Sequence, residues 1–131
     1  MNEILNFLKE NVTFYLATVD GDQPHVRPFG AVTDFEGKLY LITSNQKDVF
    51  RQIKKNPKIE ISVTGKDGQW LRLKAQAVEH DSRPARQKML DDYPSLKALY
   101  SVDDGKMAVL YLAEATATFC SFTGEPRTVT F

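Results

Sequence analysis

The sequence predicts a mainly β fold, a small antiparallel barrel with helices at its periphery, and three observations support this. The chain of 131 residues has the usual length of one domain, so we expect a single domain over residues 1–131. Segments 58–64 and 69–80 alternate apolar and polar residues with the period of a half-buried strand. Tight turns such as Asp20-Gly21-Asp22 join neighbouring segments, which implies antiparallel pairing, and closing the sheet removes exposed strand edges.

Composition excludes several classes of function. No apolar run reaches the ~20 residues that span a bilayer. Seventeen basic and seventeen acidic residues cancel, so there is no overall field to collect nucleic acid or an anionic membrane. Cys120 is the only cysteine, which excludes an internal disulfide. The first residues lack the pattern of a signal peptide, and we expect a cytoplasmic protein.

The chain in order alternates strands with a few short helices. Residues 1–11 form an amphipathic stripe that predicts a helix covering one end of the sheet. A strand as long as 69–80 must bend. Apolar, β-prone or helix-periodic runs predict the other elements: strands at 12–19, 24–32, 38–43, 58–64, 107–122 and 127–131, and helical segments at 45–57, 82–93 and 95–100.

The segment 24–32, PHVRPFGAV, is an irregular strand. Its apolar positions suit a strand, but Pro24 and Pro28 lack amide donors and Gly30 packs no side chain. It is therefore no regular central strand, and we expect something other than a neighbouring strand to contact its backbone.

The segment 38–57 predicts a strand, a polar turn and a helix. Asn45 is placed to cap the helix, and the basic sequence before Pro57 ends it. Thr43, Ser44, Asn45 and Lys47 supply two hydroxyls, an amide and a cation beside unpaired helix amides, the groups that an anionic group such as phosphate needs. The alternative is a capped helix that only connects two elements.

The two segments should lie side by side. A short turn at 34–37 joins them, so we expect their strands to pair and to bring Arg27 near Thr43 and Lys47. An irregular strand next to a cationic turn suits a flat polar ring that carries a phosphate.

Other chemistry is absent from the sequence. The chain has no GxGxxG, GxxxxGK[ST], GxSxG, HExxH or CxxC motif. His25 and His80 are far apart and predict no metal site, and Cys120 lies in an apolar run typical of a buried residue. No side chain is identified as catalytic.

The order of three segments resembles a known family. RPFG at 27–30, then LYLITSN at 39–45 with Lys47 and a helix ending in KKNP, then WLRLKAQAVE at 70–79, is similar to the FMN-binding split-barrel superfamily related to pyridoxamine 5′-phosphate oxidase. The resemblance covers roughly residues 10–120.

This resemblance implies a six-stranded split barrel that forms a homodimer, with FMN at the subunit interface. It places Arg27, Pro28 and Phe29 against the isoalloxazine ring, and Thr43, Ser44 and Lys47 at the ribityl chain and phosphate. Trp70 would approach the ring. For the dimer interface we expect part of the apolar run 107–122, with Phe119 and Phe122; the alternative is a strand inside one barrel.

The resemblance also implies a flavin-dependent oxidoreductase whose substrate differs from that of the oxidases. Their lysine five positions beyond the matching arginine is Val32 here, and the chain ends in TVTF without their closing RLxP. The alternatives are a module that binds FMN, a deazaflavin or haem without turnover, and a barrel used only for protein association.

Overall fold

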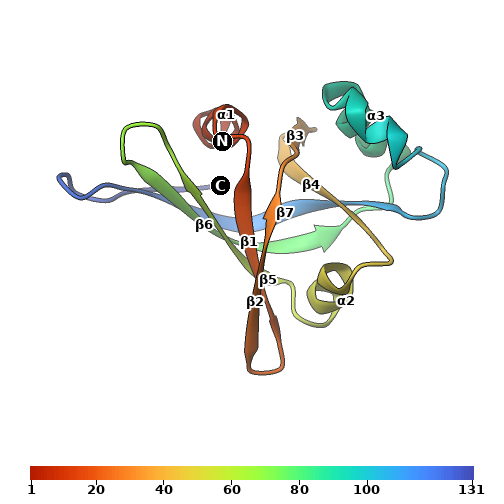
Figure 1. Cartoon of the computed structure of the whole chain (residues 1–131), viewed down its shortest axis with the longest axis horizontal. Coiled ribbons are helices and arrows are strands. Elements are labelled where there is room, and N and C mark those ends of the chain that lie inside the picture. Colours follow the sequence, from red (N-terminus) through yellow and green to blue (C-terminus); the bar gives the residue numbers. More distant parts are fainter.

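The computed structural model describes residues 1–131 as one open, eight-stranded antiparallel sheet that curls around a core, with three α-helices and a short 3₁₀ helix (Figure 1). The mainly β split barrel predicted from the sequence is confirmed. The elements, in chain order, are α1 Asn2–Glu10, β1 Phe14–Asp20, β2 Gln23–Phe29, β3 Val32–Phe35, β4 Lys38–Ser44, α2 Asp48–Lys55, β5 Lys58–Thr64, β6 Trp70–Glu79, α3 Arg83–Asp92, η1 Pro94–Ala98, β7 Met107–Cys120 and β8 Arg127–Thr130.

The strand order along the sheet is β2-β1-β5-β6-β7-β4-β3, with β8 paired to β7. All of the pairings are antiparallel, as the tight turns predict. None of the helices combines the length and apolar character needed to cross a membrane.

The main core fills the inside of the curled sheet. In β5 the alternating Ile59, Ile61 and Val63 are buried, as the period-two pattern predicts. Helix α1 adds Ile4 and Leu8 to the same cluster and so covers one end of the sheet (Figure 1).

Strand β4 is buried on both faces, which explains why its sequence is apolar without alternation. Leu39 and Leu41 face the main core, while Tyr40 and Ile42 belong to a second cluster that includes Met89 of α3. The end of β4 is therefore held between the barrel and α3.

The long strand β6 bends, as expected, at a bulge opposite β7. The register shifts between Lys74, which faces Thr116, and Gln76, which faces Ala113. Glu114 of β7 has φ 51°, a left-handed conformation that is unusual for a residue other than glycine.

The segment predicted as one strand at 24–32 divides into β2 and β3, with a break at Gly30 and Ala31. The expectation that the strand carrying Arg27 pairs with 38–43 was wrong, because β2 pairs with β1 and only β3 pairs with β4. Because proline has no amide hydrogen to donate, β2 with its two prolines suits the edge of the sheet, where it lies. The division and the separate C-terminal strand give eight strands where the family resemblance implied six.

The predicted run 107–122 ends as a strand at Cys120, and its two phenylalanines have different surroundings. Phe119 is buried and meets Phe7 of α1 edge to face at 5.6 Å between ring centroids, so its expected place in a dimer interface was wrong. Phe122 lies beyond the strand and is 92% exposed.

Candidate functional site

A pocket of about 340 Å³ opens beside the break between β2 and β3, and we call it the bend pocket. Three parts of the chain line it: the β2–β3 bend, the end of β4 with the start of α2, and the segment from Tyr93 to Tyr100. The lining residues are Arg27, Pro28, Phe29, Gly30, Ala31, Ile42, Thr43, Lys47, Val49, Tyr93, Ser95, Leu96, Leu99 and Tyr100.

Five of the residues predicted for cofactor binding meet in this pocket: Arg27, Pro28, Phe29, Thr43 and Lys47. These residues lie together although β2 and β4 do not pair with each other. The open sheet curls so that its two ends approach, and β3, which follows β2 after two residues, pairs with β4. The predicted proximity therefore holds, although the predicted route to it does not.

The Arg27 guanidinium is fixed by three partners at the inner side of β2. Nη1 donates to the Leu16 carbonyl at 3.2 Å and to the Thr18 hydroxyl at 2.8 Å, and Nη2 donates to Oε1 of Gln52 in α2 at 2.9 Å. Partial burial lowers the pKa of Arg27 from its ordinary value. The contacts tie β2 to β1 and α2, and they hold a cation at the edge of the pocket.

The α2 side of the pocket is polar. Helix α2 begins at Asp48 with Lys47 as its N-cap residue, and no side chain caps it. Asp48 pairs with Arg51 and leaves the exposed Lys47 ammonium to solvent. Thr43 beside it is 3% exposed. An exposed cation next to helix amides without a side-chain cap matches the needs of an anionic group.

The cap predicted at Asn45 was wrong. Its side-chain nitrogen donates to the Gly105 carbonyl at 2.9 Å, and its backbone N–H donates to the Lys106 carbonyl, so it joins the turn to the loop before β7. Ser44 is buried and accepts a bond from the Gln46 amide at 3.1 Å. Neither residue lines the bend pocket.

Trp70 also lies outside the bend pocket of its own chain. It pairs with Cys120 at the end of β7, whereas Thr43 pairs with Ala108 near the start of that strand. At ~3.4 Å per residue, these positions are roughly 40 Å apart along the strand. Trp70 instead contacts the exposed Phe122 ring, with centroids 5.0 Å apart.

The opposite side of the pocket is apolar and was not foreseen from the sequence. Leu96, Leu99 and Tyr100, which we call the η1 wall, line the pocket from the segment after α3, and Leu96 and Tyr100 also pack against the second core cluster. Leu99 is 68% exposed. The only sequence signal was the short helical run at 95–100, which carries no chemistry by itself.

Tyr93 joins the η1 wall to the bend. Its hydroxyl donates to the Val32 carbonyl at 3.1 Å and accepts from the Val32 amide at 3.3 Å. Burial, and then Asp104, raises the pKa of Tyr100, so its phenol stays neutral at physiological pH. The wall therefore presents no charge from its aromatic residues.

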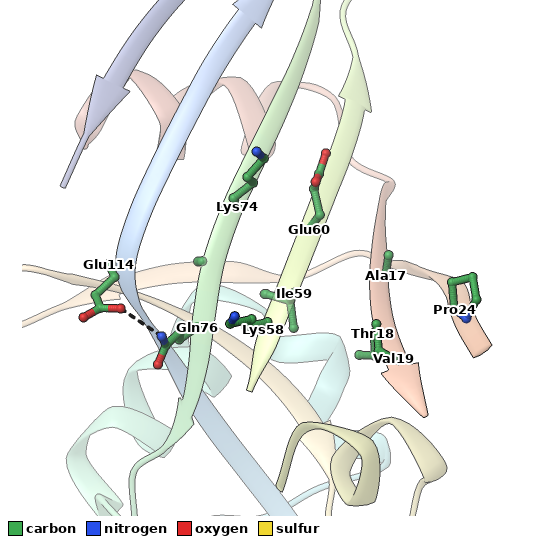
Figure 2. A pocket seen from close by; sticks show the side chains of 11 residues that line it. Ala17, Thr18, Val19, Pro24, Lys58, Ile59, Glu60, Lys74, Gln76 and Glu114 are labelled. Atoms are coloured by element: carbon green, nitrogen blue, oxygen red, sulfur yellow. Dashed lines mark hydrogen bonds between the residues drawn. The ribbon is translucent and has the colours of Figure 1, made fainter. Parts of the chain in front are cut away.

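A second hollow, of about 400 Å³, lies on the outer face of the sheet over β1, β5, β6 and β7 (Figure 2). Its charged residues, Lys58, Glu60, Lys74 and Glu114, balance, and Gln76 donates to Glu114 at 2.8 Å (Figure 2). Although this hollow is larger, it has no net positive charge for a phosphate. The bend pocket is the better candidate site for an anionic cofactor.

No three histidine, cysteine, aspartate or glutamate side chains gather closely enough to hold a metal ion. His80 instead shares a hydrogen bond of 2.7 Å between its Nδ1 and the buried Tyr40 hydroxyl. This pair belongs to an aromatic cluster between β4 and β7.

Comparison with known proteins gives a match to the family model for pyridoxamine 5′-phosphate oxidase over residues 1–120. A solved structure of a NimC/NimA family protein from Clostridium acetobutylicum is 51% identical, with a TM-score of 0.96, over 100% of this chain and 92% of that chain. A search among curated proteins found no significant match.

More distant solved structures share the fold. General Stress Protein 26 from Bacillus anthracis is 19% identical with a TM-score of 0.79, over 99% of this chain and 97% of that chain. An FMN-binding protein related to pyridoxamine 5′-phosphate oxidase from Nostoc punctiforme is 15% identical with a TM-score of 0.66, over 99% of this chain and 95% of that chain. An F420 reductase and a haem-binding protein from Mycobacterium smegmatis also share the fold. These distant likenesses show the fold alone.

Proposed function

The chain belongs to the pyridoxamine 5′-phosphate oxidase family, and from this premise we propose that it binds FMN in the bend pocket and acts as an FMN-dependent oxidoreductase. The observation that carries the proposal is the meeting of Arg27–Phe29, Thr43 and Lys47 in one pocket. A fold relative is described as FMN-binding, which supports the choice of flavin.

The residues of the pocket fit the cofactor. The exposed Lys47 ammonium would pair with the phosphate, and the Thr43 hydroxyl would bond to the phosphate or ribityl chain. Pro28, Phe29 and the bend would lie against the isoalloxazine ring, with Arg27 at its edge. When bound, the flavin supplies hydride chemistry, and the protein supplies binding and orientation.

Ser44 and Asn45 act indirectly in this proposal. Both lie in the turn between β4 and α2 without lining the pocket. Their hydrogen bonds to Gln46 and Gly105 hold the turn that presents Lys47. They are positioning residues.

We further propose a homodimer that brings Trp70 of a second copy to the flavin, because the Trp70 of the same chain lies at the far end of β7. The outer face of the sheet would form the contact. Exposed Tyr15 and Val26, at 51% and 67%, lie next to Ala17, which lines the outer hollow: Val26 pairs with Ala17, and Tyr15 precedes it by two positions in β1. Sedimentation that shows only monomer at micromolar concentration would contradict the dimer.

A second candidate is a ligand-binding module without turnover. The absence of an identified catalytic side chain favours it, and fold relatives include a haem-binding protein and an F420 reductase. The lone Cys120 suits a reducing compartment, so we place either activity in the cytoplasm.

Mass spectrometry of the ligand released from natively purified protein tests the proposal. We expect FMN, and we expect NADH or NADPH to bleach its visible absorbance. Bound FMN that neither donor reduces would favour the module without turnover. Haem or a deazaflavin in its place would overturn the choice of cofactor.

A further inference from the structure

The two sides of the bend pocket differ in chemistry. The α2 side presents the Lys47 ammonium and the Thr43 hydroxyl, whereas the η1 wall presents Leu96, Leu99 and Tyr100. The two sides come from different helices: in Figure 1, α2 and α3 lie on different sides of β4, and η1 follows α3. A ligand that fills the pocket therefore meets charge on one side and apolar surface on the other.

The η1 wall is held in place. The two hydrogen bonds between the Tyr93 hydroxyl and Val32 fix the start of η1 to β3. The backbone amides of Leu99 and Tyr100 both donate to the Leu96 carbonyl at 2.9 Å, so the wall residues form one compact turn. An exposed leucine on a fixed turn at a pocket mouth is surface available to a ligand.

The wall lacks groups that would bind an anion. Its segment lines the pocket with no lysine or arginine, since Lys97 is not among the residues that line it. Leucine and neutral tyrosine side chains recognise flat apolar rings by burial and by ring contacts. The positive charges that line the pocket belong to Arg27 of β2 and Lys47 before α2, and none comes from the η1 wall.

We propose that the η1 wall receives a neutral, planar aromatic compound as the second ligand of the bend pocket, beside the flavin. The inference rests on the proposed function for the flavin, which takes the polar side. It excludes substrates whose phosphate or carboxylate must contact the wall, since the wall would leave that charge unpaired.

Isothermal titration with two ligands of the same ring system tests the proposal: neutral 2-naphthamide and anionic 2-naphthoate. We expect 2-naphthamide to bind at least about tenfold more tightly. Leu99→Asp should weaken 2-naphthamide about tenfold, because it places a carboxylate against the ring. Leu99 is well exposed, so the variant should fold.

Lys97→Asp is the matched control, since it puts the same carboxylate on η1 outside the pocket lining, and it should leave 2-naphthamide affinity unchanged. FMN affinity, measured separately by flavin fluorescence, should be equal in all three proteins. FMN at saturation should still allow 2-naphthamide to bind.

The outcomes distinguish the proposal that FMN binds in the bend pocket from the proposal that the η1 wall binds a second ligand. Failure of FMN to bind the wild type would overturn the flavin proposal whatever the naphthalenes do. Equal affinity for the two naphthalenes, equal weakening by Leu99→Asp and Lys97→Asp, or displacement of 2-naphthamide by FMN would overturn the η1 wall as a separate ligand surface.

Discussion

The two sides of the bend pocket contrast in how they are built. On the α2 side, polar residues come from one short stretch, and Lys47 is presented by the start of a helix. On the η1 side, apolar residues come from a 3₁₀ turn that long-range bonds from Tyr93 to Val32 hold in place. The polar side depends on local sequence, and the apolar side depends on the tertiary fold. Each of the following changes affects one side.

Arg27→Met should give the largest effect. It removes three hydrogen bonds from a charged donor to Leu16, Thr18 and Gln52, which should cost about 2–3 kcal/mol in the free energy of unfolding. The Thr18 hydroxyl still donates to Gln52. Urea unfolding measures it. Arg72→Met is the control, because it removes an exposed ion pair with Glu60 and should cost less than ~1 kcal/mol. Similar losses in both variants would contradict the structural role of Arg27.

Lys47→Ala tests the polar side alone. Loss of one charge-assisted contact to the flavin phosphate should weaken FMN by about ten- to a hundredfold, or roughly 1.5–3 kcal/mol. The melting temperature of the apo protein should hardly change, because Lys47 is exposed. Lys66→Ala, in the turn between β5 and β6, should leave FMN affinity unaltered. Equal FMN quenching by wild type and Lys47→Ala would remove Lys47 from the site.

Tyr93→Phe tests the apolar side. It deletes both hydrogen bonds to Val32 and keeps the ring, so we expect a loss of about 1–2 kcal/mol in stability. Faster hydrogen exchange at 94–100 should accompany it. Ser101→Ala, which removes an exposed hydroxyl just beyond the η1 wall, is the control. Unchanged exchange in η1 would show that other packing holds the wall.

Asp92 anchors the end of α3, just before η1, through Lys88 at 2.9 Å and the Thr33 hydroxyl. Burial alone would raise its pKa, but the bonds from Thr33 and Lys88 lower the pKa overall. A lowered folded-state pKa means that ionised Asp92 adds stability above the ordinary carboxyl pKa, and this stability is lost as the pH falls through the folded-state pKa.

Asp92→Asn should therefore cost about 1 kcal/mol at pH 7, and the difference from wild type should shrink as the pH falls from about 5 through and below the ordinary carboxyl pKa. Urea unfolding at several pH values measures it. A difference that stays constant across this range would show that charge at Asp92 does not matter.

Much of the fold could be predicted from the sequence because strand periodicity and turns are local signals. Ile59, Ile61 and Val63 alternate, and their burial follows. The pairing of β2 could not be predicted, since a short turn after 24–32 favours pairing with 38–43 until the break at Gly30 and Ala31 is known.

For the site, Thr43 and Lys47 were found because cations and hydroxyls stand out at a helix start, and Arg27 was found because it lies in a strand interrupted by prolines. Asn45 was misassigned because its partner, Gly105, is 60 positions away. The η1 wall was missed because leucines and tyrosines look the same in a core and in a pocket. Only the tertiary fold separates these cases.

Amide chemical shifts of the ¹⁵N-labelled protein during FMN titration test the central claim most directly. The account predicts that the largest changes fall at Phe29, Gly30 and Ala31 in the bend and at Thr43 and Lys47 beside α2. Unmoved signals at these residues, with changes gathered instead around Glu60 and Lys74 of the outer hollow, would contradict the bend pocket as the flavin site.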